Sequence, residues 1–176
     1  MTALKTVLWT AFVPGTLTVL LPYLLLSSKR EPFTLELSVF RFAGLIPMVL
    51  GALFYLWCAW DFTFSGKGTP APFDPPKEIV VRGLYRHVRN PMYVAVLLIL
   101  IGEAILVQSA LLLILSGLLF SVFHVWVILY EEPVLRRRFG TPYEDYCVNI
   151  SRWIPGAARL TTKELNDDPL SHTKQH

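Results

Sequence analysis

The segment from Gly83 to Tyr93 concentrates polar side chains in an otherwise apolar chain. It reads Gly-Leu-Tyr-Arg-His-Val-Arg-Asn-Pro-Met-Tyr, and an apolar run from Val94 to Ile101 follows it directly. Cations at the mouth of a membrane segment are costly to bury without a partner, so they indicate a binding site. The alternative is an anchor in which Arg86 and Arg89 contact lipid headgroups. On this segment alone the two interpretations have equal weight.

A pair of acidic residues, Glu131-Glu132, follows a second apolar segment. We expect the segments Pro91–Val107 and Ala110–Tyr130 to form an antiparallel helical hairpin, because only Gln108 and Ser109 separate them. The hairpin would bring the two glutamates next to the arginines and the histidine at a membrane–water boundary. These charges could form salt bridges that fasten the hairpin.

The same charges could instead line a pocket for a zwitterionic ligand. Arginine or histidine would bind its carboxylate, and glutamate would bind its amine. The rings of Tyr85, Tyr93 and Tyr143 could face a cationic centre. S-adenosylmethionine is one such zwitterion, and its sulfonium adds the cation.

Composition places the chain in a membrane. It has 176 residues, enough for one domain, and 53% of them are hydrophobic. Only 16% are charged, whereas soluble domains carry roughly 25%. The net charge of +3 is too small to suggest nucleic acid as a partner, and the two cysteines indicate neither a disulfide framework nor a metal site.

The apolar segments predict an all-α integral membrane bundle of about four transmembrane helices: Val7–Leu26, Phe42–Trp60, Pro91–Val107 and Ala110–Tyr130. We interpret residues 61–82 as a loop, because glycines and prolines crowd it. Short cytosolic helices should begin at Pro133 and at Thr141, the second with a capping box and ending near Asn149. The chain would form a single domain over residues 1–160. Its two N-terminal helices lie in 1–60, its cofactor-binding half is 61–160, and a polar tail covers 161–176.

The basic residues predict the orientation. Four crossings would place thirteen of the 16 Lys and Arg residues on one side of the membrane, which should then be cytosolic. The protein is thus expected to be multi-pass, with its site facing the cytosol.

Several motifs together resemble the isoprenylcysteine carboxyl methyltransferase and phospholipid methyltransferase superfamily. They are the segment Gly83–Tyr93, the pair Glu131-Glu132, the run Phe139-Gly-Thr-Pro-Tyr-Glu-Asp-Tyr146 and the run Arg152-Trp-Ile-Pro155. The similarity covers about residues 66–155, and the order and spacing of the motifs make it specific. Where the family often has Arg-His-Pro, this chain has Arg89-Asn90-Pro91, with a histidine at position 87 instead.

The resemblance implies an enzyme that transfers a methyl group from S-adenosylmethionine to a lipophilic acceptor entering from the bilayer. By motif, the cofactor-binding residues would be Gly66, Gly68, Thr69, Tyr85, His87, Arg89, Asn90, Pro91, Tyr93, Glu131 and Glu132. Gly66 and Gly68 could equally serve only the flexibility of the loop. Membrane lipids are the other expected partners, and the oligomeric state stays open.

Methyl transfer requires positioning more than acid–base chemistry, because the sulfonium already activates the methyl carbon. The catalytic candidates are Glu132, Arg89 and His124, with Glu132 or His124 as the base for an amine acceptor. A carboxylate or thiolate acceptor would need no base, and His124 could instead hydrogen-bond a neighbouring helix. The competing interpretations are a nicotinamide-dependent membrane reductase of the sterol reductase kind and a non-catalytic membrane protein.

Overall fold

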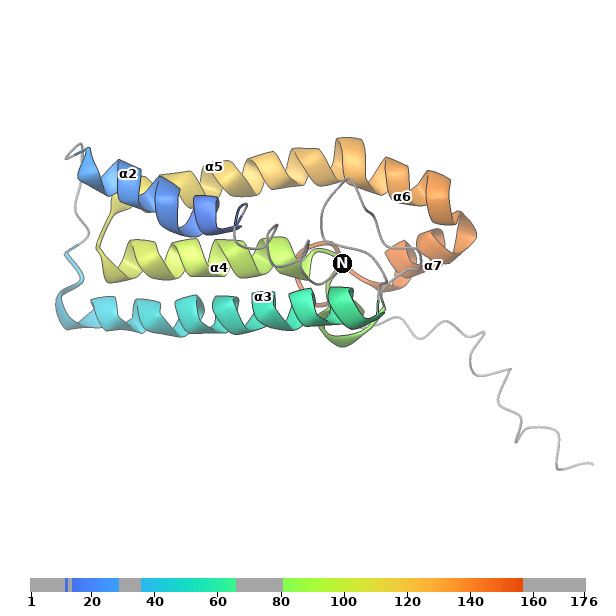
Figure 1. Cartoon of the computed structure of the whole chain (residues 1–176), viewed down its shortest axis with the longest axis horizontal. Helices are drawn as coiled ribbons and strands as arrows, with labels where there is room; N and C mark the ends of the chain where they lie inside the picture. Colours follow the sequence, from blue (N-terminus) through green and yellow to red (C-terminus); the bar gives the residue numbers. More distant parts are fainter. Residues whose placement is uncertain (1–11, 13, 29–35, 66–80, 157–176) are drawn as a thin grey trace, which may run out of the picture.

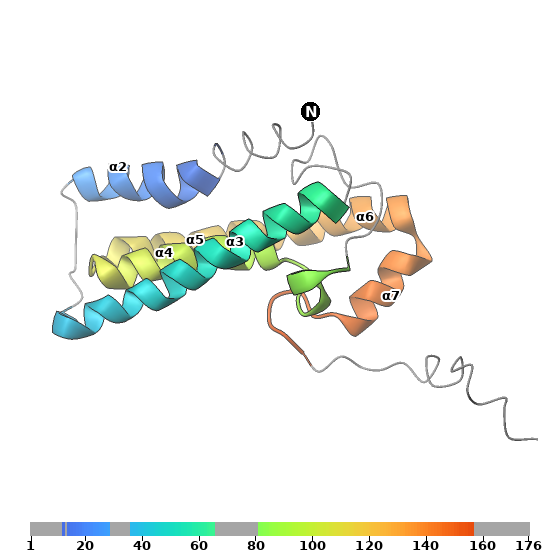
Figure 2. The same ribbon diagram turned by 60° about the horizontal axis from the view of Figure 1, so that its bottom comes forward.

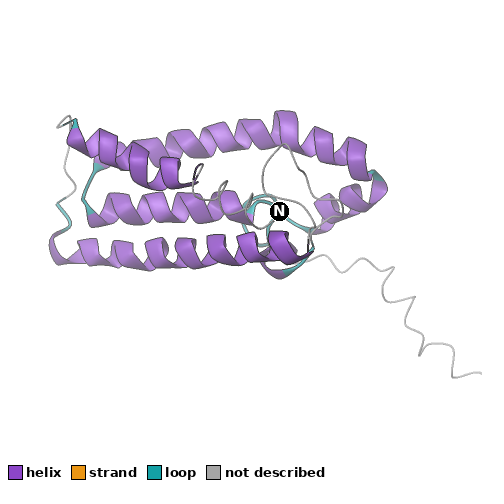
Figure 3. Ribbon diagram, viewed as in Figure 1, coloured by secondary structure: helices purple, strands orange, loops and turns teal. Residues whose placement is uncertain are grey.

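The described part of the chain is entirely helical. The structure, a computed structural model, describes residues 12, 14–28, 36–65 and 81–156 (Figure 1). Within these ranges every regular element is a helix, and the only β-type pairing is an isolated bridge between Val88 and Ser151 (Figure 3). The elements are η1 (Thr16–Leu20), α2 (Leu21–Ser27), η2 (Ser38–Gly44), α3 (Leu45–Ser65), η3 (Gly83–Arg86), α4 (Pro91–Leu106), α5 (Ala110–Trp126), η4 (Val127–Glu131), α6 (Glu132–Phe139) and α7 (Thr141–Asn149). The predicted all-α fold is confirmed for these residues.

Three long helices form the body of the molecule. Helices α3, α4 and α5 run along its longest axis, with α3 packed against α4 and α4 against α5 (Figures 1 and 2). The helical run through α5, η4 and α6 extends past the start of α4, and α7 then turns away from it (Figure 2). The end of α3, the start of α4 and the α6–α7 corner therefore meet at one end of the bundle.

Glycines allow the first two of these helices to touch through their backbones. A Cβ atom placed on Gly51 would lie 2.6 Å from the carbonyl oxygen of Ala95. One placed on Gly102 would lie 2.6 Å from the carbonyl oxygen of Gly44 and from the amide nitrogen of Met48. Small residues at helix contacts are typical of membrane proteins, where close packing rather than the hydrophobic effect holds helices together.

Two helical segments are long and apolar enough to cross a membrane, Ser38–Asp61 with 24 residues and Ala110–Phe139 with 30. Their large apolar side chains face outward, for example Phe40, which is 81% exposed, and Leu129, which is 73% exposed. Such surfaces are unfavourable in water and suited to lipid. Helix Pro91–Leu106 is shorter, about 24 Å at 1.5 Å per residue. The count of four crossings therefore stays a prediction, and most of the first half of Val7–Leu26 lies outside the described residues.

Helix α3 ends later than the sequence suggested. Residues 61–65, assigned above to the loop, complete this helix. The physical reason is local: the first helix-breaking residue after Trp60 is Gly66, so nothing in between opposes the helix.

The two predicted C-terminal helices also begin differently. Helix α6 is a continuation of α5 through a π-helical turn, Val127–Glu131, rather than a new helix at Pro133. The wider turn accommodates a proline that cannot donate the usual backbone bond. Helix α7 has Thr141 as its first residue and Gly140, at φ 60°, as its N-cap, with no side-chain capping bond. The capping box is therefore wrong, while the end at Asn149 is confirmed.

Candidate functional site

A buried carboxylate, Glu132, is the centre of a group of charges at the α6–α7 end of the bundle. Its Oε1 accepts a hydrogen bond from Arg152 Nε at 2.7 Å, and its Oε2 accepts one from Arg152 Nη2 at 3.1 Å. Arg89 Nη1 lies 3.2 Å from Oε1, and Arg136 Nη2 lies 3.9 Å from Oε2. The Glu132 side chain is only 7% exposed. Both oxygens are thus occupied by arginines from three parts of the chain.

Arg89 is shared between this carboxylate and a thiol. Its Nη1 also donates to the Sγ atom of Cys147 at 2.7 Å. Its Nε is buried and has no hydrogen-bond partner among the described residues. Buried donors are normally paired, so this nitrogen is a candidate donor for a bound ligand.

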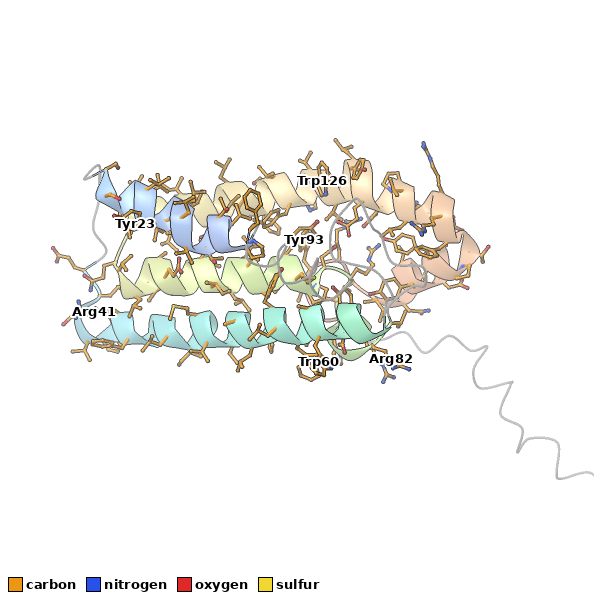
Figure 4. The ribbon with its side chains drawn as sticks, viewed as in Figure 1. Tyr23, Arg41, Trp60, Arg82, Tyr93 and Trp126 are labelled. Carbon is orange, nitrogen blue, oxygen red and sulfur yellow. The ribbon has the colours of Figure 1, made fainter. Side chains whose placement is uncertain are left out.

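The neighbouring glutamate has different partners. Glu131 Oε2 accepts a hydrogen bond from the Tyr93 hydroxyl at 2.9 Å, and no arginine of the described residues lies within salt-bridge distance. Tyr93 lies between α4 and α5 in Figure 4. Its ring packs on Phe123 at a centroid distance of 4.8 Å. Glu131 is therefore a carboxylate beside aromatic rings that carries no cationic partner here.

The Gly83–Tyr93 segment separates its polar residues by burial. Arg86 and His87 are exposed, whereas Asn90 is buried and donates through Nδ2 to the carbonyl oxygen of Arg152 at 3.2 Å. Pro91 begins α4, as predicted from its missing amide hydrogen. Asn90, at the position where the resemblance expected a histidine, thus lies next to Arg89 in the cluster, whereas His87 does not.

Three tyrosines lie next to this cluster: Tyr85 in η3 and Tyr143 and Tyr146 in α7. The Tyr146 hydroxyl donates to the carbonyl oxygen of Tyr85 at 2.7 Å. Burial raises the pKa of Tyr85, Tyr143 and Tyr146. Hydrogen bonding to Glu132 raises the pKa of Arg152 further. At neutral pH the tyrosines are consequently uncharged donors and Arg152 is a fixed cation.

His124 belongs to an aromatic group formed by α5 and the segment after α7. Its Nδ1 accepts a hydrogen bond from the Trp153 indole nitrogen at 3.0 Å. The Trp153 ring lies 5.3 Å from the ring of Phe120 and 6.4 Å from that of Tyr93. Because Nδ1 is an acceptor, a neutral His124 carries its proton on Nε2.

The C-terminal segment supplies residues to which we had given no role. Ser151 pairs with Val88 through the β-bridge, and its carbonyl oxygen accepts from the Arg89 amide at 2.9 Å. Arg152 donates to Glu132, and Trp153 donates to His124. Cys147 accepts from Arg89. The Arg-Trp-Ile-Pro run signalled Arg152 and Trp153 in the sequence, whereas Cys147 and Ser151 lie outside every motif named above.

The remaining candidates fall elsewhere. Gly66, Gly68 and Thr69 lie outside the described residues. No group of three or more metal-ligating side chains is present in the part of the chain that the structure describes.

Comparison with known proteins identifies one family. A family model described as phospholipid methyltransferase matches residues 39–142, more than half of the chain. The match includes α3, α4 and both glutamates, and it ends before Arg152. Neither the curated proteins nor the solved structures contain a match.

Proposed function

Because this chain belongs to the phospholipid methyltransferase family, and is thus a membrane methyltransferase for lipophilic substrates, we propose that its methyl donor is S-adenosylmethionine. We propose further that the donor binds at the charged cluster around Arg89 and Glu131. Membership in a family of methyltransferases also supports methyl transfer over the alternative interpretation, a nicotinamide-dependent reduction.

The observation that carries the proposal is an imbalance of charge on adjacent residues. Three arginines surround the single carboxylate of Glu132, which leaves an excess of positive charge there. Glu131, one residue away, has only the neutral hydroxyl of Tyr93 as its partner among the described residues. A ligand that carries a carboxylate and an ammonium group on one carbon would neutralise both excesses.

The residues present therefore suit the amino-acid end of the donor. The unpaired Nε of Arg89 would bind its carboxylate, and Glu131 would bind its ammonium group. Glu132 would hold Arg89 and Arg152 in position, since both of its oxygens are already engaged. When bound, the donor supplies a methyl group on a sulfonium, which an acceptor's lone pair displaces in line. The protein then has to position the acceptor and exclude water.

The acceptor would approach from the lipid side, past Phe120 and Trp153. His124 lies there with Nδ1 already bonded to Trp153, so its Nε2–H would donate a hydrogen bond to an acceptor oxygen, which keeps another lone pair for the attack. The single lone pair of an amine nitrogen would have to stay free of this bond. This arrangement gives His124 a positioning role and makes it a poor base. Both an amine and a carboxylate remain candidate acceptors.

Isotopically labelled S-adenosylmethionine tests the donor and the acceptor together. The purified protein would be incubated with it and with a lipid extract, and labelled lipids would be identified by mass spectrometry. Alkaline hydrolysis then separates the classes, because methyl esters release the label and N-methyl groups retain it. A protein that binds neither S-adenosylmethionine nor S-adenosylhomocysteine and labels no lipid would contradict the proposal.

Glu131→Gln tests the site itself. The change is nearly isosteric, so the protein should fold, while activity should fall at least tenfold, about 1.4 kcal/mol. Glu144→Gln, which alters an exposed carboxylate on α7, is the matched control and should retain full activity. Full activity in both variants would place the ammonium site elsewhere.

A further inference from the structure

A second carboxylate, Asp61 in the last turns of α3, has one oxygen that is buried without a hydrogen-bond partner among the described residues. Its Oδ2 is buried and accepts no hydrogen bond from any of the described residues. Buried polar atoms are almost always paired, so an unpaired carboxylate oxygen requires an explanation. Neither the family match nor the sequence motifs assign it a role.

The exposed residues next to Asp61 are of the kind found at a membrane–water interface. Trp57 and Trp60, on the same turns of α3, are 52% and 64% exposed, as is typical of aromatic side chains at a membrane–water interface. Figure 4 shows Trp60 beside Arg82 at this end of the helix. A carboxylate at this depth could extend into the headgroup region and be solvated. Asp61 instead turns its Oδ2 into the protein.

Gly83 makes room for that inward orientation. Its backbone has φ +52°, a conformation that residues other than glycine rarely adopt. A Cβ atom at this position would collide with Asp61 Oδ2 and would lie 2.9 Å from the Trp57 indole nitrogen. The carboxylate and the start of the Gly83–Tyr93 segment are therefore fitted closely to each other.

Tyr85 connects Asp61 to the site described above. Cys58, one turn before Asp61, is fully buried and packs with Tyr85 in one buried cluster. Tyr85 is in turn close enough to Glu131 for the two groups to interact electrostatically. The Asp61 carboxylate thus lies at the same end of the bundle as the charged cluster, but α3 carries it, whereas the cluster residues come from other segments.

We propose that Asp61 is a further binding residue of the methyltransferase site, where its Oδ2 accepts a hydrogen bond from an O–H or N–H group of the bound ligand. A carboxylate can only accept, so the complementary group has to be a donor. Two ligands of the proposed reaction carry such donors: the ribose hydroxyls of the methyl donor and the headgroup of a lipid acceptor. This inference rests on the proposed function.

The test compares Asp61→Ala and Asp61→Asn with Asp145→Asn, which alters an exposed carboxylate on α7. Three quantities are measured in one detergent: the melting temperature of the ligand-free protein, the dissociation constant of S-adenosylhomocysteine, and the KM for the labelled lipid. Because the removed oxygen had no partner, we expect the ligand-free melting temperature of the Asn variant to be unchanged or higher. The Asn variant, nearly isosteric, serves for all three measurements if the Ala variant does not fold.

A ribose contact predicts that the dissociation constant of S-adenosylhomocysteine rises at least tenfold in Asp61→Ala. An analogue lacking the ribose hydroxyls should then bind wild type and variant equally. A headgroup contact predicts instead that only the KM for the lipid rises. If neither constant changes, the proposal is overturned, and a lower ligand-free melting temperature with both constants unchanged would assign Asp61 a purely structural role. Wild-type protein that fails to bind S-adenosylhomocysteine would contradict the proposed function, independently of Asp61.

Discussion

At the scale of single residues, two consecutive glutamates have different partners. Consecutive helical residues point about 100° apart, so Glu131 and Glu132 cannot face the same partners. Glu132 turns toward Arg89 and Arg152, and Glu131 turns toward Tyr93. The sequence predicted both as cofactor-binding residues and Glu132 also as a catalytic one. The structure shows that arginines engage Glu132, while Glu131 has none of them within salt-bridge distance among the described residues.

Glu132→Gln should therefore destabilise the protein. It would leave two largely buried guanidinium groups without an anion, which typically costs about 3 kcal/mol or more. We expect a markedly lower melting temperature in detergent, with Glu144→Gln unchanged as the control. An unaltered melting temperature would show that the arginines do not depend on this carboxylate.

Arg89→Lys should weaken the binding of S-adenosylhomocysteine. Lysine can replace one contact with Glu132, but its point charge cannot also supply the donor that Arg89 Nε provides. The loss of one hydrogen bond to a charged group predicts about fivefold weaker binding, roughly 1 kcal/mol. Isothermal titration measures it, with Arg138→Lys, an exposed arginine of α6, as the control. Equal dissociation constants would indicate that Arg89 acts only as an anchor.

At the scale of elements, the contact between α3 and α4 sets the distance between Asp61 and the Gly83–Tyr93 segment. Both helices lead directly into the site, and their backbones touch at Gly51 and Gly102. Side chains added at this contact would move one helix relative to the other, because neither backbone can yield.

Gly51→Leu should thus separate the helices, lower the melting temperature and reduce activity. A Cβ at this position already lies 2.6 Å from the Ala95 carbonyl oxygen and 2.9 Å from the Ile99 amide nitrogen. Gly117→Leu is the matched control, because nothing lies within 4 Å of a Cβ placed there on the exposed face of α5. Similar behaviour of the two variants would contradict the close contact.

At the scale of the whole molecule, helix length supports the proposed place of the site at a membrane boundary. The continuous segment Ala110–Phe139 has 30 residues and measures about 45 Å at 1.5 Å per residue. The hydrocarbon core of a bilayer is only about 30 Å thick. The last ten or so residues, which include both glutamates, extend past it when the helix spans the membrane. Charged groups are then solvated while remaining next to lipid.

Cysteine labelling tests the resulting topology. We choose Arg82→Cys and Val107→Cys in a protein with both native cysteines replaced, because both positions lie among the described residues. Both side chains are exposed, and they lie at opposite ends of the bundle. We expect an impermeant reagent to label position 82 from the cytosol and position 107 from the other side. Labelling of both from one side would contradict the orientation.

The fold could be predicted where local chemistry decides it. Pro91 begins α4 and Gly140 separates α6 from α7, because proline and glycine act on their own backbone. The hairpin of α4 and α5 followed from two apolar runs and a short break. Prediction failed at the junction of α5 with α6, since whether Pro133 ends a helix depends on a π-helical turn that no local pattern announces.

What the sequence by itself determined is the class of the molecule: a helical membrane protein whose polar residues gather at one boundary and whose motifs are those of a methyltransferase family. Composition and motif order suffice for this, because every segment in lipid has to be apolar and has to pair its own backbone polar groups, as a helix does. Only the tertiary structure decided which polar residues meet. Two of the partners of Glu132, Arg89 and Arg152, come from before α4 and from after α7, and Asp61 reaches its place through the packing of α3. Those contacts depend on distances between separate segments, which residue spacing along one helix does not define.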